Sequence, residues 1–382
     1  MVQAALIGQT FGMLTGRPKD LLTVQTFHGT IITWGGRKYF MNERPAIEYI
    51  NMDDLERAPE KAWRAWSQTE EQIRLWAAIS LLDAEFSELF LGEPLLRRRT
   101  TGLVADDDLW LAPTVQQWCK MVRCRTEQSR IVIEPSTLSI GFRAYVILGD
   151  IGSAICDANA FESKAELLVK FQPSLIKFYE DHLHPLQRPD RHVDKFCLQA
   201  LWHANFLTLL ASLDRLEKAL GREGFDESQR HVEYARDWAC SSEGLRCAIH
   251  AVLILHLLER LPVGVEPAIH IPRVLFRAMV VWFCYINYGK EEWCGLRVGD
   301  VDAFPELTLL KVNSSKVLFE AQNLQYKRPS PTECITLCRF ADLLGRIGHW
   351  GLSRKLSEVW EVLLHGALET NSLQTSANHR VV

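Results

Sequence analysis

The sequence lacks an apolar run long enough to cross a lipid bilayer. Two apolar runs, Cys247–Leu258 and Val274–Tyr288, fall short of the roughly 20 residues that a membrane-spanning helix needs. His250 interrupts the first run and Arg277 the second. The mildly apolar start, Met1–Leu14, lacks the basic residues and the small-residue cleavage site of a signal peptide. We therefore predict a soluble chain with no membrane partner.

The sequence also lacks an excess of positive charge. Its 43 Lys and Arg residues are outnumbered by 47 Asp and Glu, which gives a formal net charge of −4. This balance gives no reason to expect the chain as a whole to bind phosphate backbones tightly. The one basic run, Arg97–Arg99, is followed by the acidic run Asp106–Asp108, and we interpret the two as offsetting charges in one solvated loop. Any contact with DNA would have to be local.

Ten cysteines and twelve histidines invite a search for a zinc site, but no zinc motif is present. The two cysteine pairs are five and four positions apart, whereas zinc knuckles use C-x2-C pairs. The two histidines are separated by one residue, which places them on different faces of a helix. We predict no metal ligand, and reduced thiols of the kind found in the cytosol or nucleus. The pairs are Cys119 with Cys124, Cys334 with Cys338, and His182 with His184.

Motifs for nucleotide and magnesium chemistry are missing as well. Neither a G-x-x-x-x-G-K-[ST] loop nor a strand-borne G-x-G-x-x-G occurs. Asp53-Asp54 and Asp106–Asp108 lack the further carboxylate at DDxxD spacing that would clamp magnesium. We therefore assign no cofactor-binding residue.

One catalytic alternative stays open. Three short motifs are similar, in kind and order, to those of penicillin-recognising enzymes: Ser174-Leu175-Ile176-Lys177, Tyr285-Ile286-Asn287 and His349-Trp350-Gly351. In that chemistry a lysine deprotonates the serine and a tyrosine relays the proton. The third motif should lie on a strand, yet here it falls between helical segments. We assign no catalytic residue and predict that the chain is not an enzyme; a hydrolase using Ser174, Lys177 and Tyr285 is the alternative.

What the sequence does contain is apolar residues at a helical period. With 47% hydrophobic and 24% charged residues, its composition is that of a folded globular chain. Over Lys61–Leu91 the apolar residues recur every three or four positions, apart from one gap of seven, which predicts an amphipathic helix. Ser67 and Glu70 have capping-box spacing, Glu70 and Arg74 predict an ion pair within the helix, and Gly92 is expected to follow its end. The stripe consists of Trp66, Ile73, Trp76, Ile79, Leu82, Phe86 and Leu89.

Further helical patterns cover most of the remaining chain, and no alternation of strand and helix signals a parallel sheet. The pattern over Arg273–Tyr288 would also suit a buried strand, because residues 280–285 form a continuous apolar run. We predict an all-α fold, an irregular multi-helix array with little or no β-structure. The expected helical stretches are Leu138–Ile155, Lys164–His182, Lys195–Leu220, Ser228–Ala239, Gly244–Arg260, Arg273–Tyr288, Pro305–Gln322 and Thr332–Gly366.

The breaks between these stretches are too short to be interdomain linkers. We therefore predict one domain over residues 1–366. Residues 367–382 lose the apolar period, and we expect them to form a disordered tail.

The order of several weak motifs resembles the fungal-specific transcription factor domain, also called the middle homology region. Trp63-Arg64-Ala65-Trp66, Glu70 with Arg74, and Leu81-Leu82-Asp83 with Ser87 resemble the W-x-x-W, E-x-x-R and L-D-x-x-x-S core of that domain, closest to members found beside C2H2 zinc fingers. Earlier and later landmarks follow in the expected order from about Gly8 to Leu364. They are Gly8–Gly12, Phe27–Thr30, Ile271–Phe276 with Trp282, and Leu344–Gly351.

The resemblance implies a nuclear transcriptional regulator. Its helical domain would act on a zinc-containing DNA-binding module through other transcription proteins, by sensing a metabolite or by self-association. Zinc is expected only in that module, which this chain lacks, so the regulatory domain would be N-terminally incomplete and DNA a partner only indirectly.

The chain departs from the family's pattern in two respects. The first is the missing upstream part, which would leave apolar residues around Leu6, Phe11 and Leu14 partly exposed and so predicts marginal stability or association. The second is the Leu-Pro turn usual after the Asp-containing helix, which is replaced by Ala105–Asp108. A helical protein-interaction or ligand-sensing module without a DNA role is the second alternative; Trp202, Trp282 and Tyr285 could line an effector pocket, although packed core is their expected role.

Overall fold

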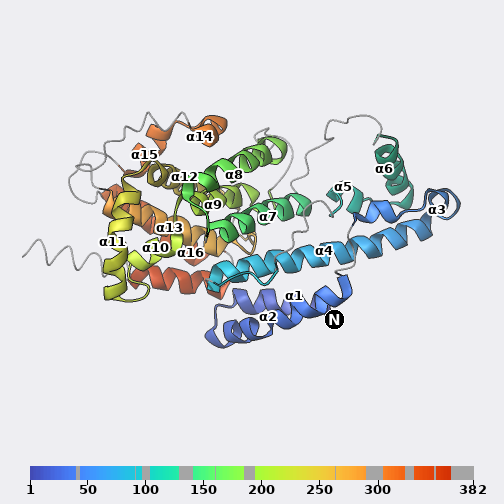
Figure 1. Cartoon of the computed structure of the whole chain (residues 1–382), viewed down its shortest axis with the longest axis horizontal. Coiled ribbons are helices and arrows are strands. Elements are labelled where there is room, and N and C mark those ends of the chain that lie inside the picture. The colour runs from blue at the N-terminus through green and yellow to red at the C-terminus, as the bar shows by residue number, and fades with distance from the viewer. Residues whose placement is uncertain are drawn as a thin grey trace, which may run out of the picture. The chain divides into compact units, whose positions relative to one another are not determined.

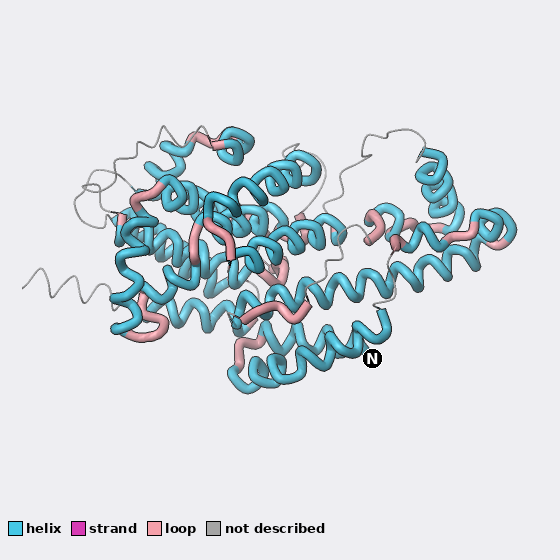
Figure 2. Tube along the Cα trace, viewed as in Figure 1, coloured by secondary structure: helices cyan, strands magenta, loops and turns pink. Residues whose placement is uncertain are grey.

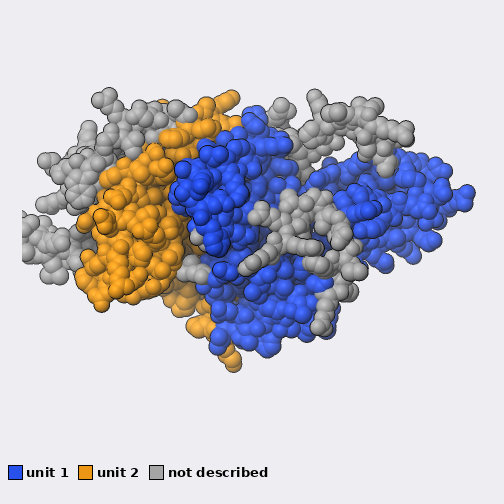
Figure 3. All heavy atoms as spheres, viewed as in Figure 1, with its two compact units in different colours: residues 1–12, 22–202 blue, residues 13–21, 203–382 orange. Residues whose placement is uncertain are grey.

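A computed structural model shows a chain built of α-helices, and no strand occurs in the parts of the chain that it describes (Figures 1 and 2). The predicted all-α class is therefore confirmed. Contacts divide the chain into two compact units (Figure 3): unit 1 comprises residues 1–12 and 22–202, and unit 2 residues 13–21 and 203–382. The single domain over 1–366 stays a prediction, and the expected tail 367–382 lies outside the described residues. The structure describes residues 1–39, 44–90, 92–96, 104–128, 141–159, 161–184, 194–262, 264–289, 304–322, 331–347 and 350–362.

Unit 1 is organised along α4 (Pro59–Phe90), a helix of 32 residues. The predicted stripe is its buried face, with Trp66, Ile79 and Leu82 almost completely enclosed. The predicted capping box at Ser67 is wrong: the helix begins at Pro59, and the Ser67 hydroxyl donates to the carbonyl of Arg64 inside it. Proline suits a first helical position because its missing N–H would lack a helical partner there.

The other elements of unit 1 surround this helix. Val2 and Ile31 pack with Leu75, Trp76 and Ile79 of α4 into one apolar cluster. Unit 1 contains α1 (Val2–Leu14) as far as Gly12, α2 (Pro18–Tyr39) from Leu22, η1 (Ala46–Tyr49), α3 (Met52–Arg57), α5 (Asp107–Trp110), α6 (Val115–Gln128), α7 (Phe142–Asn159), α8 (Lys164–Phe178), η2 (Tyr179–Leu183) and the start of α9 (Leu198–Leu210).

Gly149 explains why α7 tolerates glycine. A Cβ atom at this position would lie 2.4 Å from the Leu81 side chain of α4. The helix propensity lost at Gly149, about 1 kcal/mol relative to alanine, is thus offset by a close approach of two helices. Leu138–Ser139–Ile140, the start of the predicted stretch, lies outside the described residues.

Unit 2 has its core on α12 (Ser242–Leu258) and α13 (Ile271–Tyr288). Both helices are buried on nearly all sides, which accounts for their continuous apolar runs. The run 280–285 is helical and not a strand, in keeping with the 18-residue length of α13. The remaining elements of unit 2 are α10 (Leu213–Ala219), α11 (Phe225–Ala239), α14 (Pro305–Leu310), α15 (Ser314–Gln322), α16 (Pro331–Arg346) and the helical segment 351–362, together with the rest of α9 and the turn between α1 and α2.

Three predicted helices are each divided in the structure. Thr332–Gly366 becomes α16 and the helical segment 351–362, with Ile347 and Trp350 in neither helix. Lys195–Leu220 becomes α9 and α10, separated at Ala211 and Ser212. Pro305–Gln322 becomes α14 and α15, because Lys311 takes a left-handed conformation (φ 54°) at the end of α14. Lysine seldom adopts this conformation, so the sequence carries no signal for the break.

Two glycines bring distant parts of unit 2 into backbone contact. A Cβ atom at Gly16 (φ +63°) would lie 2.6 Å from the Leu352 nitrogen, and one at Gly351 would lie 1.9 Å from the Thr15 carbonyl oxygen. Neither space admits a methyl group, so glycine is required at both positions. The landmark Leu344–Gly351 thus ends against the turn between α1 and α2.

Within the described residues, no single helix has the length and apolarity to cross a membrane. Taken together, α11 and α12 reach that length and composition, but they meet at an angle of 85°.

Candidate functional site

The polar residues of the W-x-x-W/E-x-x-R/L-D-x-x-x-S pattern lie on α4, and two groups of contacts form around them. The first centres on Glu70 and Arg74. Arg74 Nε donates to Glu70 Oε1 over 2.9 Å, which confirms the predicted i,i+4 pair. The same Glu70 oxygen accepts from the Ala105 backbone N–H at 2.9 Å, and Arg74 donates to the Ala105 carbonyl at 2.9 Å and to Asp107 Oδ1 at 3.0 Å. Glu70 and Arg74, one helical turn apart, therefore bind both the backbone N–H and the carbonyl of Ala105.

This group of contacts is buried and lies next to aromatic rings. Glu70 is completely buried, and burial raises the pKa of its carboxyl, against the lowering effects of the Ala105 N–H and the Arg74 charge. The Arg74 guanidinium lies over Trp110 and Phe142, 4.8 and 5.5 Å from the ring centroids. The group is thus a stabilised ion pair whose charges are enclosed by side chains.

The acidic run Asp106–Asp108 takes part in these contacts. Asp107 is buried at the start of α5, and Asp106 binds Arg125 at 2.8 Å and also Arg143. The expectation of a solvated loop is therefore wrong at Asp106 and Asp107, because arginines of α4, α6 and α7 neutralise them. Arg97–Arg99 lie outside the described residues.

The second group centres on Asp83, which binds partners from two other segments. Its Oδ1 atom lies 2.8 Å from His28 Nε2 and 3.2 Å from the Leu95 N–H, and its Oδ2 atom accepts from the Leu96 N–H at 2.8 Å. His28 Nδ1 in turn lies 3.1 Å from Gln9 Oε1. Both oxygens of Asp83 therefore have hydrogen-bond partners, and these partners lie 12 or more positions away in the sequence.

Gln9 and Asp83 hold the His28 ring from both sides. Gln9 Nε2 donates to the Val24 carbonyl at 3.2 Å, which leaves the Gln9 oxygen facing the imidazole. Both ring nitrogens of His28 therefore face oxygen atoms, one of an amide and one of a carboxylate. The ring is thus fixed in the interior of unit 1 between α1 and α4.

Neither group has the arrangement of a general base. A catalytic histidine keeps one nitrogen for the proton of a nucleophile, whereas both nitrogens of His28 are occupied by Asp83 and Gln9. Both oxygens of Asp83 also accept backbone N–H groups. These contacts fasten α1, α2, residues 95–96 and residues 105–107 to α4.

Unit 2 has a buried histidine pair of its own. His203 Nδ1 and His250 Nδ1 lie 2.7 Å apart, and the His250 ring stacks on Phe206 with a centroid distance of 4.7 Å. Burial lowers the pKa of His203 to about 3 and that of His250 well below its usual value, the latter also through His203 and Arg246. Both rings are therefore neutral at physiological pH, and opposite tautomers allow one Nδ1 to donate to the other.

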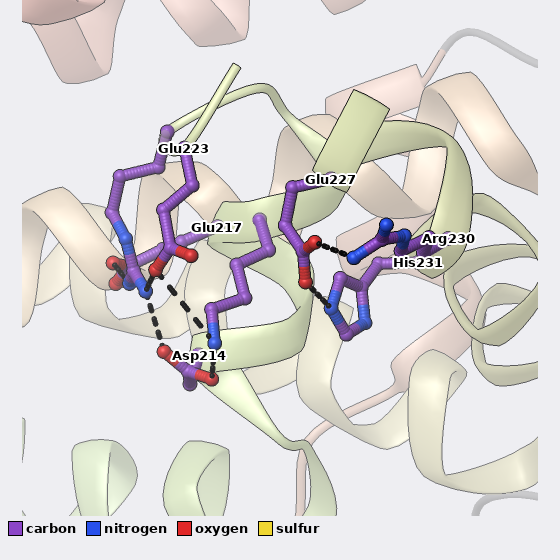
Figure 4. A network of polar contacts seen from close by, with 8 residues as sticks. Asp214, Glu217, Glu223, Glu227, Arg230 and His231 are labelled. Carbon is purple, nitrogen blue, oxygen red and sulfur yellow. Dashed lines mark hydrogen bonds and ion pairs between the residues drawn. The ribbon is translucent and has the colours of Figure 1, made fainter. Parts of the chain in front are cut away.

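Two groups of charged contacts lie on α10 with the turn after it, and on α11 (Figure 4). Arg222 donates to Asp214, Glu217 and Glu223 at 2.6 to 2.9 Å, and Lys218 binds Asp214 at 3.0 Å. These residues belong to α10 and to the turn in which Gly221 and Gly224 have positive φ values of 94° and 96°. On α11, Glu227 binds Arg230 and His231. Each contact stays within one helix or the turn next to it, and partly exposed pairs of this kind stabilise a fold only slightly.

The described part of the chain includes Ser174, Lys177 and Tyr285 of the hydrolase alternative, but not His349. Ser174 and Lys177 are exposed, three positions apart on α8 in unit 1. Tyr285 is half-buried on α13 in unit 2, and His349 lies outside the described residues.

The candidate zinc residues are also scattered. Cys119 is buried on α6, and burial raises the pKa of its thiol, whereas Cys124 and Cys338 are exposed. His182 belongs to η2 and His184 follows it, while the side chain of Cys334 lies outside the described part. No group of three or more His, Cys, Asp or Glu side chains that could hold a metal occurs among the described residues.

Sequence reasoning did not identify Gln9, His28, Asp107 or the His203–His250 pair as members of polar contacts. A polar residue on the apolar side of a helical pattern is the one signal that the sequence offers for such a contact. Of the suggested effector residues, Trp202 and Trp282 are completely buried, and the Trp202 indole donates to the Leu175 carbonyl at 2.8 Å.

Comparisons of the chain with known protein families, with curated proteins and with solved structures found no match. The resemblance to the fungal-specific transcription factor domain therefore stays a prediction from the motifs.

Proposed function

We propose that this chain is a helical regulatory domain of a transcription factor, of the fungal-specific kind, that works in the nucleus by binding other proteins. In this proposal it performs no catalysis and holds no cofactor. DNA is reached indirectly or through a separate zinc module.

One observation carries the proposal. Glu70, Arg74 and Asp83, the charged residues of the resemblance, are all on α4, and each binds a segment distant in sequence. Their contacts attach other segments of unit 1 to α4. Such a structural role is expected of residues that are characteristic of a domain family and take no part in catalysis. The distant contacts give a physical reason for the motif spacing, and this supports the resemblance.

A reporter experiment tests the proposal. The whole chain is fused to an unrelated DNA-binding domain in a fungal host whose reporter carries that domain's site. We expect reporter output to change relative to the DNA-binding domain alone, and to return to that level when Asp83→Ala loosens α4. Arg64→Ala, at an exposed position of the same helix, is the matched control and should behave like the unaltered chain.

Unchanged output from a folded, nuclear fusion would contradict a role in transcription and favour the interaction or ligand-sensing module. A fluorophosphonate probe tests the hydrolase separately. Labelling of the purified chain that disappears in Ser174→Ala would replace the regulator with an enzyme.

A further inference from the structure

The outer face of α1 and α2 carries large apolar side chains that nothing in unit 1 covers. Phe11 is 72% exposed, Ile7 69%, Phe27 56% and Trp34 42%. On each helix these residues follow a helical period: Ile7 and Phe11 are four positions apart, as are Thr23 and Phe27, and Trp34 lies seven beyond Phe27. Two apolar ridges therefore run along adjacent helices.

Between α1 and the ridge of α2 lies a groove with a volume of about 260 Å³. Its wall on α1 consists of small side chains, Ala5 and Gly8, next to Gln9. Gly8 marks an open position, because a Cβ atom there would have no neighbour within 4 Å. The wall on α2 is formed by Thr23, Val24, Phe27, Thr30, Ile31 and Trp34.

We propose that this face, the α1–α2 groove, is where two copies of the chain associate. An isologous interface has to supply both projections and hollows from one patch. The groove does so, since Phe27 and Trp34 line it opposite the hollow at Gly8, and Phe11 lies three positions beyond Gly8 on the same helix. The inference does not depend on a role in transcription.

Charge favours a second copy over other occupants. α1 carries no Asp, Glu, Lys or Arg, and α2 carries none between Leu21 and Gly36. Two such faces meet without removing a charged group from water, which would be costly. An acidic or basic partner helix, or an anionic lipid surface, would find no opposite charge there.

The size of the face predicts a weak dimer. A helix of 13 residues is about 20 Å long and a pair of helices about 20 Å wide. Each copy then contributes roughly 400 to 600 Å², and the total of about 800 to 1,200 Å² lies at the lower end for specific complexes. We expect reversible association with a Kd of roughly 10 to 100 μM.

Sedimentation velocity of the full chain from about 1 to 300 μM tests this, since the range brackets the expected Kd. The weight-average sedimentation coefficient should rise with concentration. Gly8→Met should raise the Kd at least tenfold by filling the groove, while leaving the fold intact because the site is open and methionine favours helix over glycine. Phe11→Glu should do the same by placing a charge on the ridge.

Phe161→Glu is the matched control, because Phe161 is 89% exposed elsewhere in unit 1. Its Kd should equal that of the unaltered chain. A coefficient constant over the whole range, or a dimer that survives Phe11→Glu, would overturn the proposal. So would loss of the dimer in Phe11→Glu with Gly8→Met unaffected, since the contact would then lie off the groove. Flotation with phosphatidylcholine vesicles that Phe11→Glu abolishes, for a chain that stays monomeric, would assign the face to a lipid surface instead.

Discussion

His28 and Asp83 are 55 residues apart in sequence, yet the ring of one and the carboxylate of the other meet at 2.8 Å in the interior of unit 1. Each is in turn held by a further contact, His28 by Gln9 and Asp83 by the backbone at Leu95 and Leu96. The pair therefore joins four segments of the chain, namely α1, α2, α4 and residues 95–96.

Replacing Asp83 with alanine should destabilise the chain strongly. The change leaves a buried imidazole and two backbone N–H groups without their acceptor, and each buried polar group left without a partner costs about 1 to 3 kcal/mol. The free energy of unfolding measured in urea should fall accordingly. Asp53→Ala, at an exposed position on α3, should lower it by no more than about 1 kcal/mol. Equal free energies of unfolding for the two variants would contradict the anchoring role of Asp83.

A double-mutant cycle on Glu70 and Arg74 should show strong coupling. Arg74→Met alone leaves the buried Glu70 carboxylate without its cation, whereas Arg74→Met combined with Glu70→Gln removes the charge as well. We expect the double variant to be more stable than the sum of the single changes by about 1 to 3 kcal/mol, measured by urea unfolding. Additive effects would mean that the two residues act independently.

Acid should weaken unit 2 through its histidine pair. The folded pKa values of His203 and His250 are lowered, His203 to about 3, so the unfolded chain binds more protons below its ordinary histidine pKa near 6.5. Stability should therefore fall as pH drops from about 6.5, by up to about 1.4 kcal/mol per pH unit and per histidine. A His203→Leu/His250→Leu chain should lose part of this slope between pH 6.5 and 5. An unchanged slope would show that the pair is not the cause.

Two glycine substitutions should have opposite effects. Gly351→Ala forces a methyl group to within 1.9 Å of the Thr15 carbonyl oxygen, and the required backbone shift should lower the melting temperature. Gly8→Ala meets open space in the middle of α1 and should stabilise the helix by up to about 1 kcal/mol. Thermal unfolding by circular dichroism measures both, and a stable Gly351→Ala chain would refute the close approach.

The sequence predicts those features whose determinants are local. The stripe on α4 and the Glu70–Arg74 pair depend on residues three and four positions apart, and both were predicted. The start of α4 at Pro59 was not, because Ser67 and Glu70 imitate a cap inside a continuous helix. Asp107 and His28 acquire their roles through contacts 19 or more residues away, and no periodicity encodes such a pairing. The break at Lys311 depends on a conformation that lysine rarely adopts.

The contact of Gly351 with Thr15 has a consequence for synthesis. The turn between the first two helices belongs to unit 2, so it stays without its final neighbours until the ribosome has released residues beyond 351. At about 5 to 20 residues per second this delay lasts roughly 15 to 70 s. During that interval Met13 and Leu14, which are buried in the folded chain, lack these neighbours. Chaperone binding to ribosome-bound chains arrested at increasing lengths should therefore decline only after the helical segment 351–362 has emerged.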